Sequence, residues 1–325
     1  ANAILGVSLA VAQASAQANG IPLFRSLGTG TTLPLPEIQI FGGGAHANWR
    51  IDVQDLLVIA TGARNYAETL EITFEVFHAA GDIMKKRGKL SGCADEGGYW
   101  PEFSSNEEAL ATFTEAVERA GFTPGIEASL SLDIAASDLY DEANGTYRLA
   151  SENRTFTSDE FMDLLVGWCR NYNVASIEDP AADTDWHGWQ RFYQACGSTT
   201  QIIGDDLFTT NLSRIEEGIS RGVANSVLIK LNQIGTVTET LDAIRLTRQA
   251  GWAPVISARS GETEDAFISH LAVATNAGQL KVGSFCRSER MAKWNECLRI
   301  ERLLGSEATF PGKNALAQNL PRPSR

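Results

Sequence analysis

Charged residues stand at the ends of three successive apolar, β-rich runs in the second half of the chain. The runs read VASIEDP, QIIGDDL and NSVLIKLNQIGT, and their charged residues are Glu178, Asp205 and Lys230. Glu178 and Asp205 are 27 residues apart, and Asp205 and Lys230 are 25 residues apart. That period is about the length of one strand, one helix and two short loops. Charged strand ends repeated at this period predict a parallel (β/α) barrel whose strand ends carry the chemistry.

A third acid, Asp133, ends the earlier run IEASLSLD. We therefore expect Asp133, Glu178 and Asp205 at the same end of three strands. Three carboxylates crowded together cannot all ionise without a cation, and hard oxygen ligands favour magnesium. The alternative is that each acid merely caps the helix that follows it. Considered together with nearby lysines, the three acids predict a metal site.

Two lysines also end predicted strands, Lys230 in VLIKLNQ and Lys281 in GQLKVGS. A buried lysine beside another cation and a metal loses proton affinity and can act as a base near neutral pH. A lysine that reaches solvent, or that pairs with a neighbouring acid, is the simpler interpretation of either one alone. Two lysines on the same rim as three acids favour the catalytic interpretation.

The segment ISARSGETED places Arg259, Ser260 and Gly261 between a predicted strand and a predicted helix. A helix start offers free N–H groups, and with an adjacent arginine and serine hydroxyl it suits a phosphate. Plain helix capping is the alternative. His46, in a Gly-rich loop, and Glu96, in the segment DEGG, would by themselves be solvated loop residues.

Strands and helices alternate regularly after Thr157, as a barrel requires. The predicted strands lie near residues 174–178, 200–205, 226–230, 253–258 and 279–284, and the predicted helices near 158–171, 186–195, 211–221, 237–249, 264–276 and 288–303. Upstream, strands 35–41 and 54–59 are close enough in sequence to form an antiparallel hairpin. Two helices follow, one from about Tyr66 with Leu70, Phe74, Phe77 and Met84 on one stripe, the other at 105–120. Segment 141–147 is expected to be a turn.

The first residues predict a separate element. Residues 1–18 form a helix that is apolar nearly all round, so it is expected to be buried on most sides, and a linker follows. The expected organisation is a terminal helix and linker at 1–30, a barrel at 31–310 and a polar tail at 311–325.

Composition excludes several classes of protein. The chain has 325 residues, 43% of them hydrophobic, which is enough for one large barrel. Its net charge of −13 leaves no basic stripe for nucleic acid. Five scattered cysteines without a CxxC motif indicate reduced thiols, which favours a cytoplasmic protein. No apolar run approaches the ~20 residues that a membrane span needs, so no membrane partner is expected.

The order and spacing of these segments resemble enolase (phosphopyruvate hydratase). The matching segments are ANAILGVSLA, GGGAHA, DEGG, SLD, SIEDP, GDDL, KLNQIGT, ARSGETED and KVGSFCRSER. The resemblance implies an α/β fold, an enolase-type (β/α)8 barrel whose first two strands are a hairpin. It also implies a preceding α+β domain of which only the last helix is present, a Mg2+ cofactor, a small phosphorylated carboxylate as substrate, and a homodimer.

The resemblance also implies roles for the candidate residues in dehydrating 2-phosphoglycerate to phosphoenolpyruvate. The metal ligands are Asp133, Glu178 and Asp205. The catalytic group comprises Lys230 as the base, Glu96 as the acid that assists departure of the 3-hydroxyl, His46 in a closing loop, and Asp55. The substrate-binding group comprises Lys281 facing the carboxylate, Arg259 and Ser260 at the phosphate, and Gln54.

Two departures from the family pattern leave other functions open. Ala258 stands where the family usually has His, and Asp55 stands where it usually has Glu, one methylene longer. A misplacement of 1 Å can cost about a hundredfold in rate. One alternative is a paralogue that acts on a related phosphorylated or phosphono carboxylate. Another is a non-catalytic binding protein. An acid-sugar dehydratase is less favoured, because it does not call for the RSG phosphate site.

Overall fold

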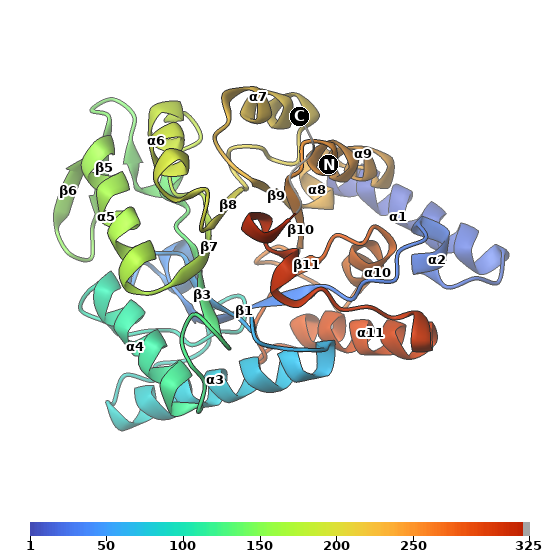
Figure 1. Ribbon diagram of the computed structural model, residues 1–325, viewed down its shortest axis with the longest axis horizontal. Coiled ribbons are helices and arrows are strands. Elements are labelled where there is room, and N and C mark those ends of the chain that lie inside the picture. Colours follow the sequence, from blue (N-terminus) through green and yellow to red (C-terminus); the bar gives the residue numbers. More distant parts are fainter. Residues whose placement is uncertain (321–325) are drawn as a thin grey trace.

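Eight strands close into a barrel in the computed structural model, which describes residues 1–320 (Figure 1). The strands are β1 (Leu35–Gly42), β2 (Asp55–Ile59), β3 (Ser129–Asp133), β7 (Val174–Glu178), β8 (Gln201–Gly204), β9 (Ser226–Ile229), β10 (Ala253–Ser257) and β11 (Gln279–Gly283). Their order around the barrel is β1-β11-β10-β9-β8-β7-β3-β2. The α/β barrel predicted from the sequence is therefore confirmed.

One strand of the barrel, β2, runs against its neighbours. It pairs antiparallel with both β1 and β3, whereas the other neighbouring strands pair parallel. Asp55, the first residue of β2, lies opposite Gly42 at the end of β1 and opposite Asp133 at the end of β3. The predicted hairpin is confirmed. It brings the start of β2 to the barrel end where the other strands finish.

Two helices follow β2 and connect it to β3. Helix α3 (Tyr66–Lys86) packs against α4 (Asn106–Arg119), and the connection between them lies at the end of the barrel where β1 finishes. Asn65 and Ser105 cap the two helices by accepting hydrogen bonds from backbone N–H groups in their first turns. The expected apolar stripe of α3 is only partly correct, because Phe74 is 43% exposed while Phe77 and Met84 are buried.

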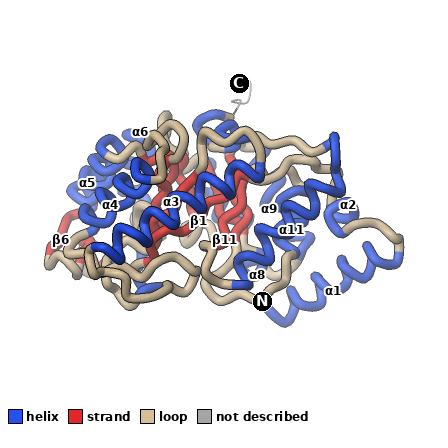
Figure 2. Tube along the Cα trace, turned by 90° about the horizontal axis from the view of Figure 1, so that it is seen from below, coloured by secondary structure: helices blue, strands red, loops and turns tan. Residues whose placement is uncertain are grey.

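The remaining helices cover the outside of the barrel strands (Figure 2). They are α5 (Ser158–Asn171), α6 (Trp186–Cys196), α7 (Leu212–Arg221), the short α8 (Leu231–Ile234), α9 (Val237–Gln249), α10 (Phe267–Ala274) and α11 (Ser288–Leu304). Helix α5 starts with a capping box between Thr157 and Glu160. Helix α10 starts at Phe267, so no helix begins at Arg259–Gly261, and the predicted helix start at that site is wrong.

A three-stranded antiparallel sheet lies outside the barrel and includes part of the segment expected to be a turn. Its strands are β4 (Tyr140–Asp141), β5 (Thr146–Leu149) and β6 (Arg154–Thr157), in the order β4-β5-β6. Tyr147 is fully buried between this sheet and α5, where its ring stacks on Phe161. Single-turn 3-10 helices occupy Gly44–Ala47, Ala136–Leu139, Gly305–Glu307, Gly312–Ala315 and Ala317–Asn319.

The first residues of the chain are less buried and more regular than expected. Helix α1 (Asn2–Ala18) was expected to be buried on most sides, yet Ile4, Val7 and Val11 are exposed. The expected linker contains α2 (Leu23–Leu27), which packs against α10. None of the helices in residues 1–320 is long and apolar enough to cross a membrane.

The expected polar tail after residue 310 is joined to the barrel over most of its length. Ala315 and Leu316 are buried against Leu35 and Ile59, at the end of the barrel opposite the charged strand ends. The backbone carbonyl of Ala315 accepts a hydrogen bond from Gln279 Nε2 at 2.9 Å. The remainder of the expected tail, residues 321–325, lies outside the described residues.

Candidate active site

A cavity of about 220 Å3 opens at the charged strand ends of the barrel. The side chains that the sequence predicted for the site and that line this cavity are His46, Gln54, Glu96, Asp133, Asp205, Lys230, Arg259, Ser260 and Lys281. The other two predicted residues, Asp55 and Glu178, are buried beside them, 0% and 2% exposed. The barrel thus brings residues from distant parts of the sequence to one place.

Lys281 lies between two of the predicted metal ligands. Its Nζ donates hydrogen bonds to Asp133 Oδ2 and Glu178 Oε2, each at 2.8 Å. Burial by itself would lower the pKa of Lys281, but Asp133 and Glu178 hold that pKa well above its usual range. Burial, with the nearby Asp133 carboxylate, raises the pKa of Glu178 well above its usual range. The other oxygen of Glu178, Oε1, is buried without a hydrogen-bond partner.

Lys230 pairs with the third predicted ligand. Its Nζ donates to Asp205 Oδ2, and Gln233 Nε2 donates to Asp205 Oδ1 at 2.8 Å. Burial would lower the pKa of Lys230, but Asp205 and then Glu178 raise it above its usual value. The sequence-based expectation that this lysine has a lowered pKa is therefore wrong for the structure as it stands. The reason is that the acids predicted to hold a cation pair directly with the two lysines.

Three further predicted residues form a second group at the cavity wall. His46, Asp55 and Glu96 each place one potential ligand atom within 4.8 Å of the others, and His46 Nδ1 lies 3.6 Å from Asp55 Oδ1. Burial, with the Asp55 carboxylate, raises the pKa of Glu96. Burial would lower the pKa of His46, but Asp55 raises it to about 9. Both shifts favour the protonated forms of these two neighbouring side chains.

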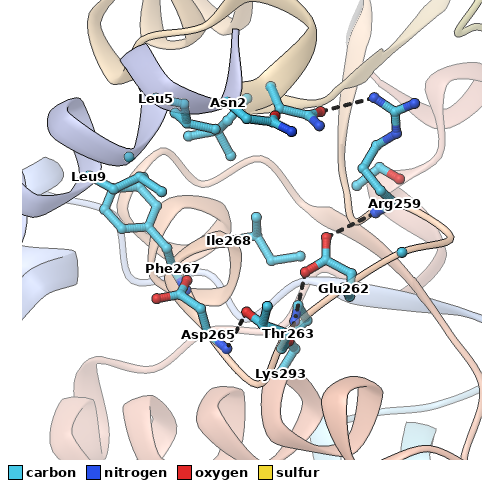
Figure 3. A pocket seen from close by; sticks show the side chains of 15 residues that line it. Asn2, Leu5, Leu9, Arg259, Glu262, Thr263, Asp265, Phe267, Ile268 and Lys293 are labelled. Carbon is cyan, nitrogen blue, oxygen red and sulfur yellow. Dashed lines mark hydrogen bonds and ion pairs between the residues drawn. The ribbon is translucent and has the colours of Figure 1, made fainter.

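The Arg259–Ser260 segment forms the opposite wall without a helix start. Arg290, which is fully buried, donates from Nη1 to the carbonyl of Arg259 and from Nη2 to the carbonyl of Ser260, each at 2.6 Å. The Arg259 side chain is exposed and bonds Asn232 Oδ1 from Nη1 at 3.0 Å. Arg259 also lines a neighbouring pocket under α1, where its backbone N–H bonds Glu262 Oε1 (Figure 3).

The geometry agrees with comparison to known proteins. Residues 30–319 match the family described as "Enolase, C-terminal TIM barrel domain". The chain is 53% identical over 320 residues to "Enolase 1" of Desulfitobacterium hafniense (strain Y51), covering 98% of this chain and 73% of that protein. The chain belongs to the enolase family. It is an enzyme of the lyase class, of the phosphopyruvate hydratase type.

Several residues at this cavity were not predicted from the sequence. Asp179 accepts hydrogen bonds from the backbone N–H groups of Asp205 at 2.9 Å and Asp206 at 2.8 Å, so it fixes the turn that presents Asp205. Oxygens of these three acids lie within 4.8 Å of one another. The doubled acids in SIEDP and GDDL were the available sign. Arg290 lies in the matching segment KVGSFCRSER, but nothing in its spacing indicated a buried side chain.

Proposed function

We propose that this enolase-family chain catalyses the magnesium-dependent dehydration of 2-phosphoglycerate to phosphoenolpyruvate. The observation that carries the proposal is that Lys230, Lys281 and the three acids Asp133, Glu178 and Asp205 meet at one cavity, paired with one another. An elimination of water from a weakly acidic carbon needs a base, an acid and concentrated positive charge at the substrate carboxylate. Each of these requirements has a side chain at this cavity.

The three acids suit a divalent cation. Their ligand atoms are all carboxylate oxygens, which magnesium prefers, and Glu178 Oε1 is buried without a partner that would offset its desolvation. We assign Asp133, Glu178 and Asp205 as the residues that would hold the Mg2+, although among the described residues the three acids whose oxygens lie within 4.8 Å of one another are Asp179, Asp205 and Asp206. The ion would supply positive charge that stabilises negative charge developing on the substrate carboxylate. Gln54 Nε2 donates to Asp133 Oδ2 at 3.1 Å and so orients one of these ligands.

Lys230 and Lys281 divide the work on the substrate carbon. Lys281 faces the substrate carboxylate and supplies fixed positive charge, which makes the C2 proton more acidic. Lys230 removes the C2 proton through its neutral Nζ, and it must first release the proton that it holds while paired with Asp205. A cation held by Asp205 and Glu178 would offset the negative charge that raises the pKa of Lys230 and so would favour its neutral form.

Glu96 gives its proton to the departing 3-hydroxyl, which leaves as water while the C2–C3 double bond forms. Burial and the Asp55 carboxylate raise the pKa of Glu96, which favours its protonated form. Asp55 and His46 stand beside Glu96 and set its charge environment. Arg259 and Ser260 provide the guanidinium and hydroxyl donors for the phosphate, with the backbone of the segment held by Arg290.

Two variants test the division between base and acid. In deuterated water, the wild type is expected to dehydrate 2-phosphoglycerate and to exchange the C2 proton of this substrate for deuterium. Chelation of divalent cations should stop both reactions. Lys230→Met should lose both reactions by about a hundredfold or more. Glu96→Gln should lose dehydration by a similar factor but keep exchange, because the base remains. Wild-type turnover at background with magnesium present, or Lys230→Met equal to wild type, would contradict the proposal.

A related substrate is the second candidate. Ala258 is buried at the cavity wall and offers no donor to the phosphate side, and the carboxylate of Asp55 is one methylene shorter than that of Glu. A paralogue acting on another phosphorylated or phosphono carboxylate would turn over such an analogue and leave 2-phosphoglycerate unchanged. Ala258→His should then shift the preference back toward 2-phosphoglycerate. A cytoplasmic homodimer belongs to the same proposal, and sedimentation of the full-length protein tests the dimer.

A further inference from the structure

Gln39, a buried residue of β1, contacts both parts of the site that carry the acids Asp55 and Glu96. Its side chain is 0% exposed. Nε2 donates to Asp55 Oδ1, and Oε1 accepts from the backbone N–H of Gly98 at 2.8 Å. Gly98 lies two residues after Glu96 in the connection between α3 and α4. One amide therefore joins a barrel strand to the loop that bears the proposed acid.

The backbone around this amide leaves room for it on two sides. A Cβ at Gly98 would stand 2.6 Å from Gln39 Oε1, closer than side chains approach. A Cβ at Gly42 would stand 3.2 Å from Gln39 Nε2 and 2.5 Å from the Cβ of Ala94. Both positions are glycine, so the long amide and the loop fit together only because neither position has a side chain.

The amide also determines which way Asp55 faces. Because Gln39 Nε2 donates a hydrogen bond to Asp55 Oδ1, the other oxygen of Asp55, Oδ2, faces Lys281 Nζ. The distance between these two atoms is 3.8 Å, and Oδ2 makes no hydrogen bond. Asp55 is a short acid at a position where a longer carboxylate would reach further into the cavity. Gln39, its partner, has a long amide side chain. The lengths of the two side chains together therefore determine how far the Asp55 carboxylate reaches into the cavity.

We propose that Gln39 is a positioning residue that compensates for the short Asp55 side chain and couples Asp55 to the Glu96 loop. This inference rests on the proposed roles of Asp55 and Glu96. The loop has other attachments, since Ser284 N–H donates to the carbonyl of Glu96 at 2.8 Å. Gln39 links the loop directly to Asp55. Its loss should therefore affect rate more than substrate affinity.

Exchanging one methylene between the two side chains tests the compensation. Asp55→Glu alone makes the pair too long, and Gln39→Asn alone makes it too short, so each should lower kcat about tenfold to a hundredfold with little change in KM. In the Gln39→Asn background, Asp55→Glu should instead raise kcat. Gln201→Asn is the matched control, a buried glutamine bonded to Gln279 at the other end of the barrel, and it should leave kcat unchanged.

Hydrogen exchange at the Gly98 amide supplies a readout that does not depend on turnover. Gln39→Asn should speed exchange at Gly98, because the shorter amide cannot reach it, and Gln201→Asn should not. Unchanged exchange in Gln39→Asn overturns the inference, as does an equal effect of Asp55→Glu on kcat in both backgrounds. Should the wild type fail to turn over 2-phosphoglycerate, the proposed function is lost, while the Gly98 measurement still decides whether Gln39 holds the loop.

Discussion

The pKa values of Glu96 and Lys230 are both raised, for different physical reasons. Burial, with Asp55 adding to it, raises the pKa of Glu96. Burial acts against the proton of Lys230, but Asp205 and Glu178 outweigh it. These shifts favour the protonated, working state of the proposed acid and oppose the neutral, working state of the proposed base. Any cation that takes over the negative charge of Asp205 favours the working state of Lys230.

His46 gives a prediction for pH-dependent stability. The pKa of His46 is about 9 in the folded protein against an ordinary value of 6.5, chiefly because Asp55 outweighs the cost of burial. A raised folded-state pKa contributes stability that is complete below about pH 6.5 and is lost as pH rises through about 9. His46→Gln should lack this contribution. Urea unfolding across that range should show the two proteins converging toward high pH. A constant difference between them would contradict the assigned pKa.

At the scale of elements, the segment between β10 and α10 depends on a side chain of another helix. Arg290 of α11 donates to the carbonyls of Arg259, Ser260 and Val282, at 2.6, 2.6 and 2.8 Å. These carbonyls would otherwise be buried without partners or exposed by a shift of the segment. A helix start was the expected support for this anion site, and a buried guanidinium takes its place.

Removing that guanidinium should therefore destabilise the protein strongly. Leaving a buried carbonyl without a donor costs about 1–3 kcal/mol, and the carbonyl of Val282 is buried while those of Arg259 and Ser260 are part-buried, so Arg290→Met should lower the free energy of unfolding by about 2–4 kcal/mol. Arg299→Met on the same helix is the matched control. The Arg299 side chain is 62% exposed and forms an ion pair with the nearby Glu296, so its loss should stay within about 0.5 kcal/mol. Similar urea midpoints for the two variants would contradict this account of the segment.

The sequence was most informative where a strand ends in a charge. Asp133, Asp205, Lys230 and Lys281 line one cavity and Glu178 is buried beside it, because parallel strand ends meet at one end of a barrel. The sequence was least informative about which side chains pair with one another at the site. The raised pKa of Lys230 depends on its distance from Asp205, which the spacing of the two residues in the sequence does not determine. The small β4-β5-β6 sheet was missed because its strands are too short to show a period.

At the scale of the whole molecule, helix α1 leaves an apolar surface open. Ile4, Val7 and Val11 are 63%, 66% and 63% exposed and lie along one side of the helix. Contiguous exposed apolar surface promotes association. Val7→Lys with Val11→Lys should therefore reduce concentration-dependent self-association of this 325-residue chain, measured by light scattering. The melting temperature should stay unchanged, because neither side chain is buried. Leu5→Ala, at a buried position, should lower it instead.

The reversed strand β2 frees one catalytic group from the geometry of the barrel. Lys281 lies on β11 and Lys230 directly follows β9, and the stagger of these strands is fixed by closure of the barrel, so neither lysine can move without changing the strands. Glu96 stands on the connection between α3 and α4, which exists at that end only because β2 turned back. Residues gained or lost there would shift the proton donor while the lysines stay in place. Insertions or deletions in this connection, natural or engineered, can thus change the position of Glu96 relative to the two lysines without changing the barrel.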